Sequence, residues 1–142
     1  MTQIGMRNFT FSGCGSYEEA RAASSEIVTM RRVRELGVDG VLELIPEGQR
    51  YYCTIDIDGL DPAIAPGTGS PSPGGFMYEE VIDLLRGVAS RGQVVGIDLV
   101  EMAPPYDATG ATSLLAAQLL LRFLGYVFAP GNDARESLAI SK

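Results

Sequence analysis

The sequence predicts an α/β fold with a mostly parallel sheet and helices packed on it. Apolar, strand-like runs alternate with helical spacing along the chain, which is typical of right-handed crossovers between parallel strands. The run over residues 93–100 (QVVGIDLV) is apolar at nearly every position, as in a strand covered on both faces. With 142 residues, 46% of them apolar, the chain is long enough to bury one core.

The first elements are short. Residues 1–8 predict a strand, and residues 26–30 (EIVTM), which are rich in β-branched side chains, predict another. Between them, a helix is expected over residues 17–23. Ser16 is its expected cap, and acidic residues occupy its first turn.

Helical spacing follows over residues 31–36 and again over residues 38–45. Gly37 stands between these stretches and is the expected point of division into two helices. Pro46 ends the second stretch.

The second half predicts strands at residues 51–57 and 93–100, with helices at residues 78–88 and 112–128. A long Gly- and Pro-rich loop covers residues 59–75. Ligands of such parallel sheets bind beyond the carboxyl ends of the strands.

No linker or repeat divides the chain. We therefore expect one domain over residues 1–129 and a flexible tail over residues 130–142.

Composition narrows the function. The net charge of −7 repels phosphate backbones, which argues against nucleic-acid binding. The apolar run at residues 114–128 is interrupted by Gln118 and Arg122, and we expect it not to span a membrane.

No leader pattern opens the chain, and the two cysteines lack metal-type spacing, so a cytoplasmic protein is expected. Histidine is absent, so this chain alone cannot supply an imidazole base or ligand.

The first candidate chemical segment carries Asp56 and Asp58, two residues apart at the end of a predicted strand. Alternate strand residues point to the same side, so both carboxylates can converge on one hard cation such as Mn²⁺ or Mg²⁺. Asp61 precedes a proline and is suited to bracing the loop by Asx-type hydrogen bonds. The pattern equally suits acids that simply end a strand and begin a turn.

The second segment carries Asp98 inside an apolar strand and Glu101 where that strand ends. A buried carboxylate is costly unless it has a partner. A carboxylate at the position of Glu101 can hold a guanidinium through two parallel hydrogen bonds. The residues alone favour the plainer alternative, in which Asp98 accepts local hydrogen bonds and Glu101 is solvated.

Together these segments resemble the ureohydrolases, the family of arginase, agmatinase and guanidinobutyrase. Residues 54–75 (TIDIDGLDPAIAPGTGSPSPGG) and residues 94–107 (VVGIDLVEMAPPYD) carry the resemblance, in the family's order and spacing. The likeness runs from about residue 3 to about residue 128, and is closer to the agmatinase branch. It implies the C-terminal portion of a three-layer α/β/α sandwich.

The resemblance implies a hydrolase with two Mn²⁺ ions that releases urea from a guanidino compound such as agmatine. Asp56 and Asp58 would be metal ligands, and Glu101 would bind the substrate guanidinium. Family members commonly assemble as homo-oligomers. Thr54, Asp61 and Asp98 would not bind the metal themselves but would hold the metal ligands in position.

The chain departs from the family in one respect. The family's Gly-Gly-Asp-His and Asp-Ala-His-x-Asp segments, which supply the other metal ligands, are absent. The isolated chain is therefore expected to be inactive, and its sheet to have an exposed edge or face. Two alternatives stay open: a non-catalytic interaction module or half-enzyme of the same fold, and a simple divalent-cation binder.

Overall fold

The computed structural model describes residues 1–7 and 14–129, and within these ranges the predicted alternation of strands and helices is confirmed. The first strand is β1 (Thr2–Met6), followed by helix α1 (Cys14–Ala22) and strand β2 (Glu26–Thr29). Helix α1 begins two residues before Ser16, so the predicted capping role of Ser16 is wrong. The expected tail lies outside the described residues.

Helix α2 (Met30–Leu42) follows β2 directly, and the Thr29 side chain caps its first turn. Gly37 breaks the helix with a left-handed backbone, at φ 69° and ψ 172°, where the sequence predicted a division.

The second half contains the longer elements. Strand β3 (Arg50–Asp56) ends in the short 3₁₀ helix η1 (Ile57–Gly59), and α3 (Tyr78–Arg91) leads to β4 (Gln93–Val100). A second 3₁₀ turn, η2 (Pro104–Tyr106), precedes the long helix α4 (Ala111–Phe128).

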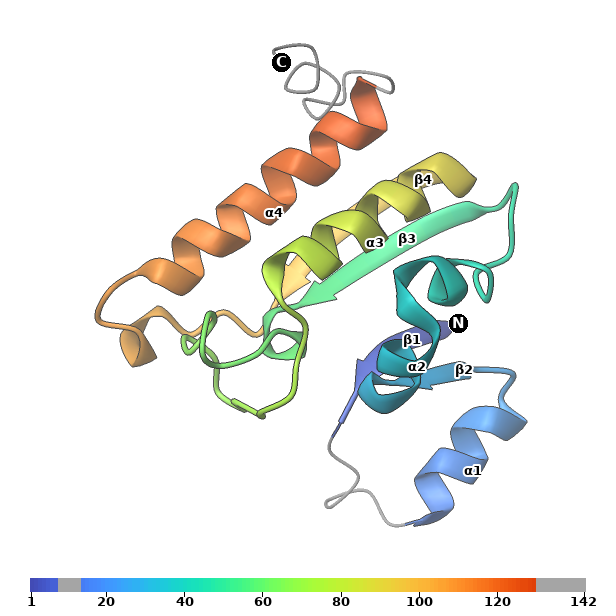
Figure 1. Ribbon diagram of the computed structural model, residues 1–142, viewed down its shortest axis with the longest axis horizontal. Coiled ribbons are helices and arrows are strands. Elements are labelled where there is room, and N and C mark those ends of the chain that lie inside the picture. The colour runs from blue at the N-terminus through green and yellow to red at the C-terminus, as the bar shows by residue number, and fades with distance from the viewer. Residues whose placement is uncertain (8–13, 130–142) are drawn as a thin grey trace.

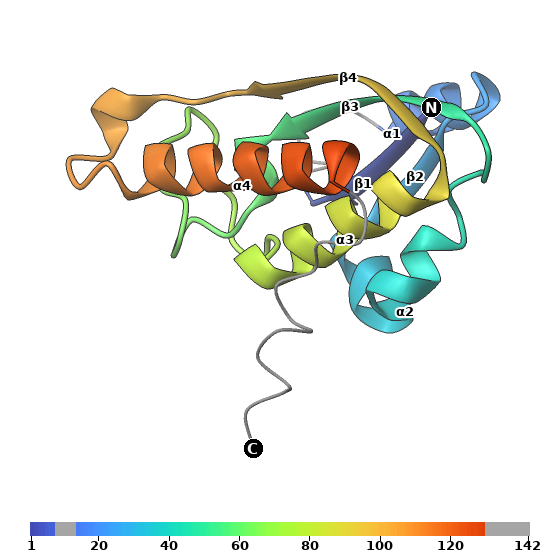
Figure 2. The same cartoon turned by 90° about the horizontal axis from the view of Figure 1, so that it is seen from above.

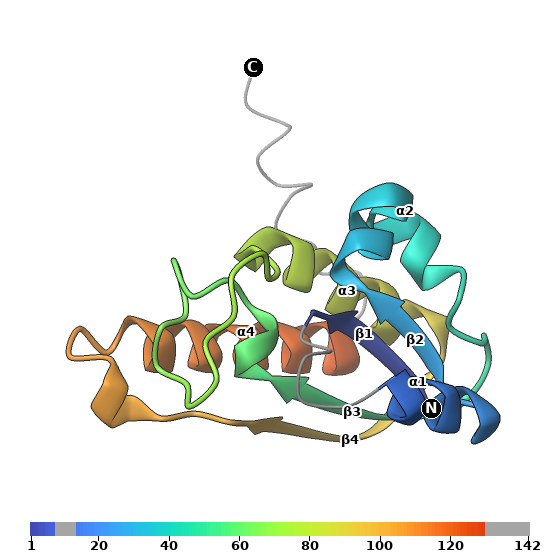
Figure 3. The same ribbon diagram turned by 90° about the horizontal axis from the view of Figure 1, so that it is seen from below.

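The strands are parallel, as predicted, but they form two separate pairs. Strand β1 pairs with β2, and β3 pairs with β4, while no ladder joins β1 to β3 in the described part of the chain. The two pairs lie side by side, and β1 and β3 point the same way (Figures 1 and 3). The sheet therefore has internal open edges, as the resemblance led us to expect.

Helices α3 and α4 cover one face of the β3–β4 pair (Figure 2). The opposite face of this pair carries Tyr52, a residue that is 66% exposed. No described element packs over this face (Figure 2). Two of the three expected layers are thus present here. The core between these layers and α2 is apolar and includes Val41, Ile55, Ile57, Ile82, Leu85, Leu119 and Phe123.

Helix α4 has 18 residues and is apolar enough, by length and composition, to cross a membrane, contrary to the expectation from the sequence. Core helices of soluble folds meet the same criterion. One side of α4 is buried through Ala116, Leu119 and Phe123, and the helix packs against α3. The other side of α4 is exposed in the structure through Leu121, Leu124 and Phe128.

Candidate functional site

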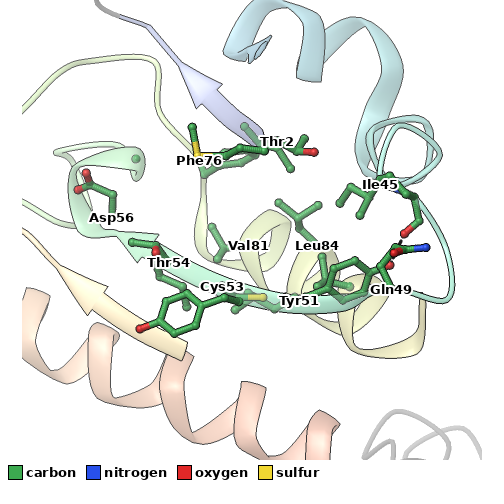
Figure 4. A pocket seen from close by; sticks show the side chains of 18 of the residues that line it. Thr2, Ile45, Gln49, Tyr51, Cys53, Thr54, Asp56, Phe76, Val81 and Leu84 are labelled. Atoms are coloured by element: carbon green, nitrogen blue, oxygen red, sulfur yellow. Dashed lines mark hydrogen bonds between the residues drawn. The ribbon is translucent and has the colours of Figure 1, made fainter. Parts of the chain in front are cut away.

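The site begins where β3 ends. The Oδ1 atom of Asp56 accepts a hydrogen bond from the backbone N–H of Asp58 at 3.1 Å, which caps η1. Ile55 and Ile57 on either side are buried, so the strand is anchored while the Asp56 carboxylate points outward. Figure 4 shows this carboxylate at the end of β3.

Three carboxylates influence one another at this end of the sheet. Burial raises the pKa of Asp56, and the nearby charges of Asp58 and Glu101 raise it further, while the hydrogen bond from the Asp58 backbone opposes the shift. The ladder sets Asp56 opposite Val100, so Glu101 leaves β4 beside it. The parallel pairing thus brings together the two segments that the sequence singled out.

Glu101 has a left-handed backbone with φ 63°, one of two non-glycine residues with positive φ in the described chain. This conformation turns the chain sharply after β4. A Cβ at Gly69 would lie 4.0 Å from Oε2 of Glu101, so the Gly-rich loop approaches this carboxylate closely.

That loop is fastened to the exit of β4. Thr68 and Met102 form an antiparallel bridge, and the Ala103 N–H donates to the Gly67 carbonyl at 2.8 Å. The loop's position relative to Glu101 is therefore fixed by backbone hydrogen bonds.

Asp61 holds the other end of the loop. Its carboxylate accepts backbone N–H groups from Ala63 at 2.9 Å, Gly74 at 2.8 Å and Gly75 at 3.3 Å. These hydrogen bonds hold the pKa of Asp61 below its usual range. Asp61 therefore acts on the loop, and its oxygens are committed to backbone donors.

Asp98 lies on the face of the sheet that no helix covers. Its Oδ2 accepts a hydrogen bond from the Tyr52 hydroxyl at 2.9 Å, and this bond raises the pKa of Tyr52. Its Oδ1 is buried without a hydrogen-bond partner among the described residues. Thr54 is its ladder partner on β3, and Gly96 leaves room for the Tyr52 ring. Thr54 and Asp56 are two apart on β3, so Asp98, Thr54 and Asp56 lie on the same face of the sheet.

Arg7 is a functional neighbour that the sequence interpretation did not single out. Its guanidinium donates to the carbonyls of Asp58 and Gly59, the latter at 2.9 Å, and to Gly5 at 3.2 Å. The end of β1 is thereby tied to the turn that carries Asp58. The sequence feature that could have pointed to Arg7 is its position at the end of a predicted strand, where ligand sites of parallel sheets lie.

A second missed residue is Asp107, which is 7% exposed. It accepts hydrogen bonds from the backbone N–H and hydroxyl groups of both Thr109 and Thr112, and these bonds hold its pKa well below the usual range. The Thr112 hydroxyl also accepts the Gly67 N–H at 2.9 Å. The start of α4 is therefore locked to the Gly-rich loop.

The metal-ligand set within the described residues is partial. Asp56 and Asp58 offer carboxylate oxygens, which suit a hard divalent cation. No group of three or more His, Cys, Asp or Glu side chains in this part of the chain is arranged to hold a metal ion. A complete centre needs ligands from elsewhere.

The fold is that of the ureohydrolases. The structure of proclavaminate amidinohydrolase from Streptomyces clavuligerus superposes with a TM-score of 0.82 at 40% identity, over 89% of this chain and 42% of that one. Agmatine ureohydrolase of Thermoplasma volcanium superposes with a TM-score of 0.78 at 33% identity, over 89% of this chain and 42% of that one. The chain belongs to the arginase family, whose model matches residues 1–125.

Sequence relatives agree with this assignment. The Streptomyces clavuligerus amidinohydrolase is 45% identical over 122 residues, which cover 84% of this chain and 38% of the relative. Guanidinobutyrase of Pseudomonas aeruginosa is 49% identical over 77 residues, covering 54% of this chain and 24% of the relative. The chain thus spans about two fifths of the first of these relatives and less of the second.

Proposed function

We propose that this chain carries part of the active site of an agmatinase-like, Mn²⁺-dependent amidinohydrolase, which converts a guanidino compound and water to an amine and urea. The observation that carries the proposal is the gathering of Asp56, Asp58 and Glu101 beyond two adjacent parallel strands. Relatives named for agmatine, guanidinobutyrate and proclavaminate chemistry support a guanidino or amidino substrate.

Asp56 and Asp58 are the residues that would hold Mn²⁺. Burial and like charge disfavour the ionised form of Asp56, so a cation at this position would relieve the repulsion. Bound Mn²⁺ would supply Lewis-acid activation of water near neutral pH. Because the described residues contain only part of a ligand set, we propose that the isolated chain is inactive.

Glu101 is the proposed guanidinium-binding residue. A carboxylate presents two oxygens to the two N–H groups of a guanidinium in one plane. The chain turns at Glu101, directly after β4, and Gly69 lies beside its carboxylate. Asp61 and Asp98 would fix the loop and strand on which these groups stand.

The test is a chimera of Salmonella agmatinase, which is 44% identical over 96 residues of this chain. The matched segment of that enzyme is replaced by this chain's residues. Urea release is measured in the presence of Mn²⁺ with each of three substrates in turn. These are agmatine, guanidinobutyrate and the guanidino compound from which proclavaminate would be released. We expect release from at least one of these compounds.

Variants of the chimera separate the roles. Asp58→Asn should lower bound Mn²⁺, whereas Glu101→Gln should keep Mn²⁺ and lower kcat/KM by about 100-fold. Glu43→Gln, an exposed acid outside the site, is the matched control. A folded, Mn²⁺-loaded chimera that released no urea from any substrate would refute the proposal and favour the non-catalytic alternative.

A further inference from the structure

Two consecutive residues of the Gly-rich loop are paired with the chain that leaves β4. The Ala103 N–H donates to the Gly67 carbonyl at 2.8 Å, and Thr68 forms an antiparallel bridge with Met102. The loop therefore lies antiparallel to the residues that follow Glu101 and is joined to them by backbone contacts.

The backbone of Glu101 needs such a support. Its left-handed conformation, with φ 63°, is unfavourable for an L-residue and persists only where the surrounding structure holds it. The contacts that hold it begin directly after Glu101, at residues 102 and 103. The same loop reaches the side chain, since a Cβ at Gly69 would lie 4.0 Å from Oε2 of Glu101. The place of the Glu101 carboxylate thus depends on the place of the loop.

Thr112, on α4, holds the loop in turn. Its hydroxyl oxygen accepts the Gly67 N–H at 2.9 Å, so the backbone of Gly67 is bound to Thr112 through its N–H and to Ala103 through its carbonyl. A Cβ at Gly67 would lie 2.9 Å from this hydroxyl oxygen, which is why the close approach requires glycine. Thr112 is 0% exposed, so bulk water does not compete for the hydrogen bond.

Asp107 fixes the direction of the Thr112 hydroxyl. Its Oδ2 accepts hydrogen bonds from both the N–H and the hydroxyl of Thr112, each at 2.7 Å. The single hydroxyl proton is thereby committed to Asp107, which leaves the oxygen to accept from Gly67. Hydrogen bonds to an ionised carboxylate are stronger than neutral ones. The start of α4, which lies at the same end of the β3–β4 pair as the loop (Figure 1), therefore presents a fixed acceptor to it.

We propose that Thr112 is a positioning residue for Glu101 and acts on it through Gly67 and Ala103. The proposal rests on the proposed function, because it takes Glu101 to be the guanidinium-binding residue. It adds that the orientation of the bound guanidinium depends on a hydroxyl on another element, whose own hydrogen bonds go to Asp107 and Gly67.

Two substitutions separate the hydroxyl of Thr112 from its shape. Thr112→Val keeps the shape and removes the hydroxyl, whereas Thr112→Ser keeps the hydroxyl and removes a methyl group. Both should lower stability because the residue is fully buried, so stability alone does not distinguish them. Thr109→Ala is the matched control, because the Thr109 hydroxyl donates to the other carboxylate oxygen of Asp107, Oδ1.

The first measurement is amide hydrogen exchange in the full chain, without Mn²⁺. Thr112→Val should speed up exchange of the Ala103 amide by about tenfold or more, although its own acceptor is unchanged. Thr112→Ser and Thr109→Ala should leave it within about twofold of the parent. The Gly74 amide, which Asp61 holds at the other end of the loop, reports general loosening of the chain.

Unchanged exchange at Ala103 in Thr112→Val, or equal acceleration at Ala103 and Gly74, would overturn the proposal. If Thr112→Val fails to fold, exchange in the parent chain at increasing urea concentrations decides. The amides of Gly67 and Ala103 should then share one free energy of opening, and independent opening of the two would count against the proposal.

The second measurement is kinetic and uses the amidinohydrolase chimera. Thr112→Val should lower kcat/KM by about tenfold while bound Mn²⁺ stays constant, and Thr112→Ser should keep the parent value. In a Glu101→Gln background, Thr112→Val should cause no further loss, because Thr112 acts through Glu101. Losses that multiply in the double variant would show that Thr112 acts on activity by another route and would refute its assignment.

The two measurements fail separately. A folded, Mn²⁺-loaded parent chimera without urea release would refute the proposed function, and exchange in the full chain would then decide whether Thr112 controls the backbone after Glu101. An active chimera with independent Thr112 and Glu101 effects would leave the proposed function in place and overturn only the role of Thr112.

Discussion

Replacing Gly75 by alanine should disrupt the turn that carries the acidic residues. A Cβ at Gly75 would lie 2.4 Å from the Leu60 carbonyl carbon and 2.6 Å from the Asp61 nitrogen. Carbon atoms pack at about 3.5–4.0 Å, so one backbone segment must move by about 1 Å. That movement breaks two hydrogen bonds of 3.0 Å, Asp61 N–H to Phe76 O and Phe76 N–H to Gly59 O.

The expected loss combines overpacking of about 1–3 kcal/mol with about 1 kcal/mol for each broken hydrogen bond, and so amounts to about 3–5 kcal/mol. The clash is with backbone on both sides, so a change of side-chain rotamer cannot relieve it. Urea unfolding followed by circular dichroism measures the change in the free energy of unfolding.

The control is Gly59→Ala, in the same turn, because a Cβ at Gly59 meets no atom within 4 Å. It should change the free energy of unfolding by no more than about 0.5 kcal/mol. Equal stability of the Gly75 and Gly59 variants would show that the close approach of the two segments is not required by the fold.

Three further predictions concern stability. Hydrogen bonds from Thr109 and Thr112 hold the pKa of Asp107 low, so the stability they contribute is present above about pH 4 and is lost as the pH falls. The melting temperature of Asp107→Asn should therefore be lower at neutral pH and vary less between about pH 2 and 5. The pKa of Asp56 is raised instead, so the stability that its protonated form contributes is present below about pH 4 and is lost as the pH rises through the raised pKa. Asp56→Asn should therefore melt higher than the parent at neutral pH in EDTA. Gly125→Ala fills open space on α4 and should stabilise the chain by about 0.5–1 kcal/mol in urea unfolding.

The sequence was most informative where local preferences decide the structure. The bounds of β4 and the break at Gly37 lie where the pattern predicted them, and a left-handed backbone explains the break. The predicted burial of β4 on both faces is wrong for the described chain, because Val95 and Val100 are exposed. The start of α1 was misplaced because glycine and serine favour turns, yet Ser16 lies within the helix.

The open edges were expected from the family resemblance, but the place of the break could not be read from the residues. Parallel pairing joins segments far apart in the chain, so which strands are neighbours is decided by packing. The link from α4 to the Gly-rich loop depends on a similar distant contact, because the Gly67 N–H donates to the Thr112 hydroxyl. The hydrogen bonds that Asp107 accepts from Thr109 and Thr112 are local, and the sequence interpretation missed them. The roles assigned to Asp56, Asp58 and Glu101 stay predictions until the chimera is assayed.

The backbone conformation of Glu101 affects which residues are favoured at position 101 during evolution. A left-handed conformation costs an L-residue about 1–2 kcal/mol, and glycine escapes this cost. A chain selected for stability alone would therefore carry glycine after β4. Random mutagenesis screened for heat resistance should recover Glu101→Gly repeatedly. A screen for hydrolysis of the guanidino compound by the assembled enzyme should reject the same substitution. Selection for stability and selection for activity would therefore favour different residues at position 101.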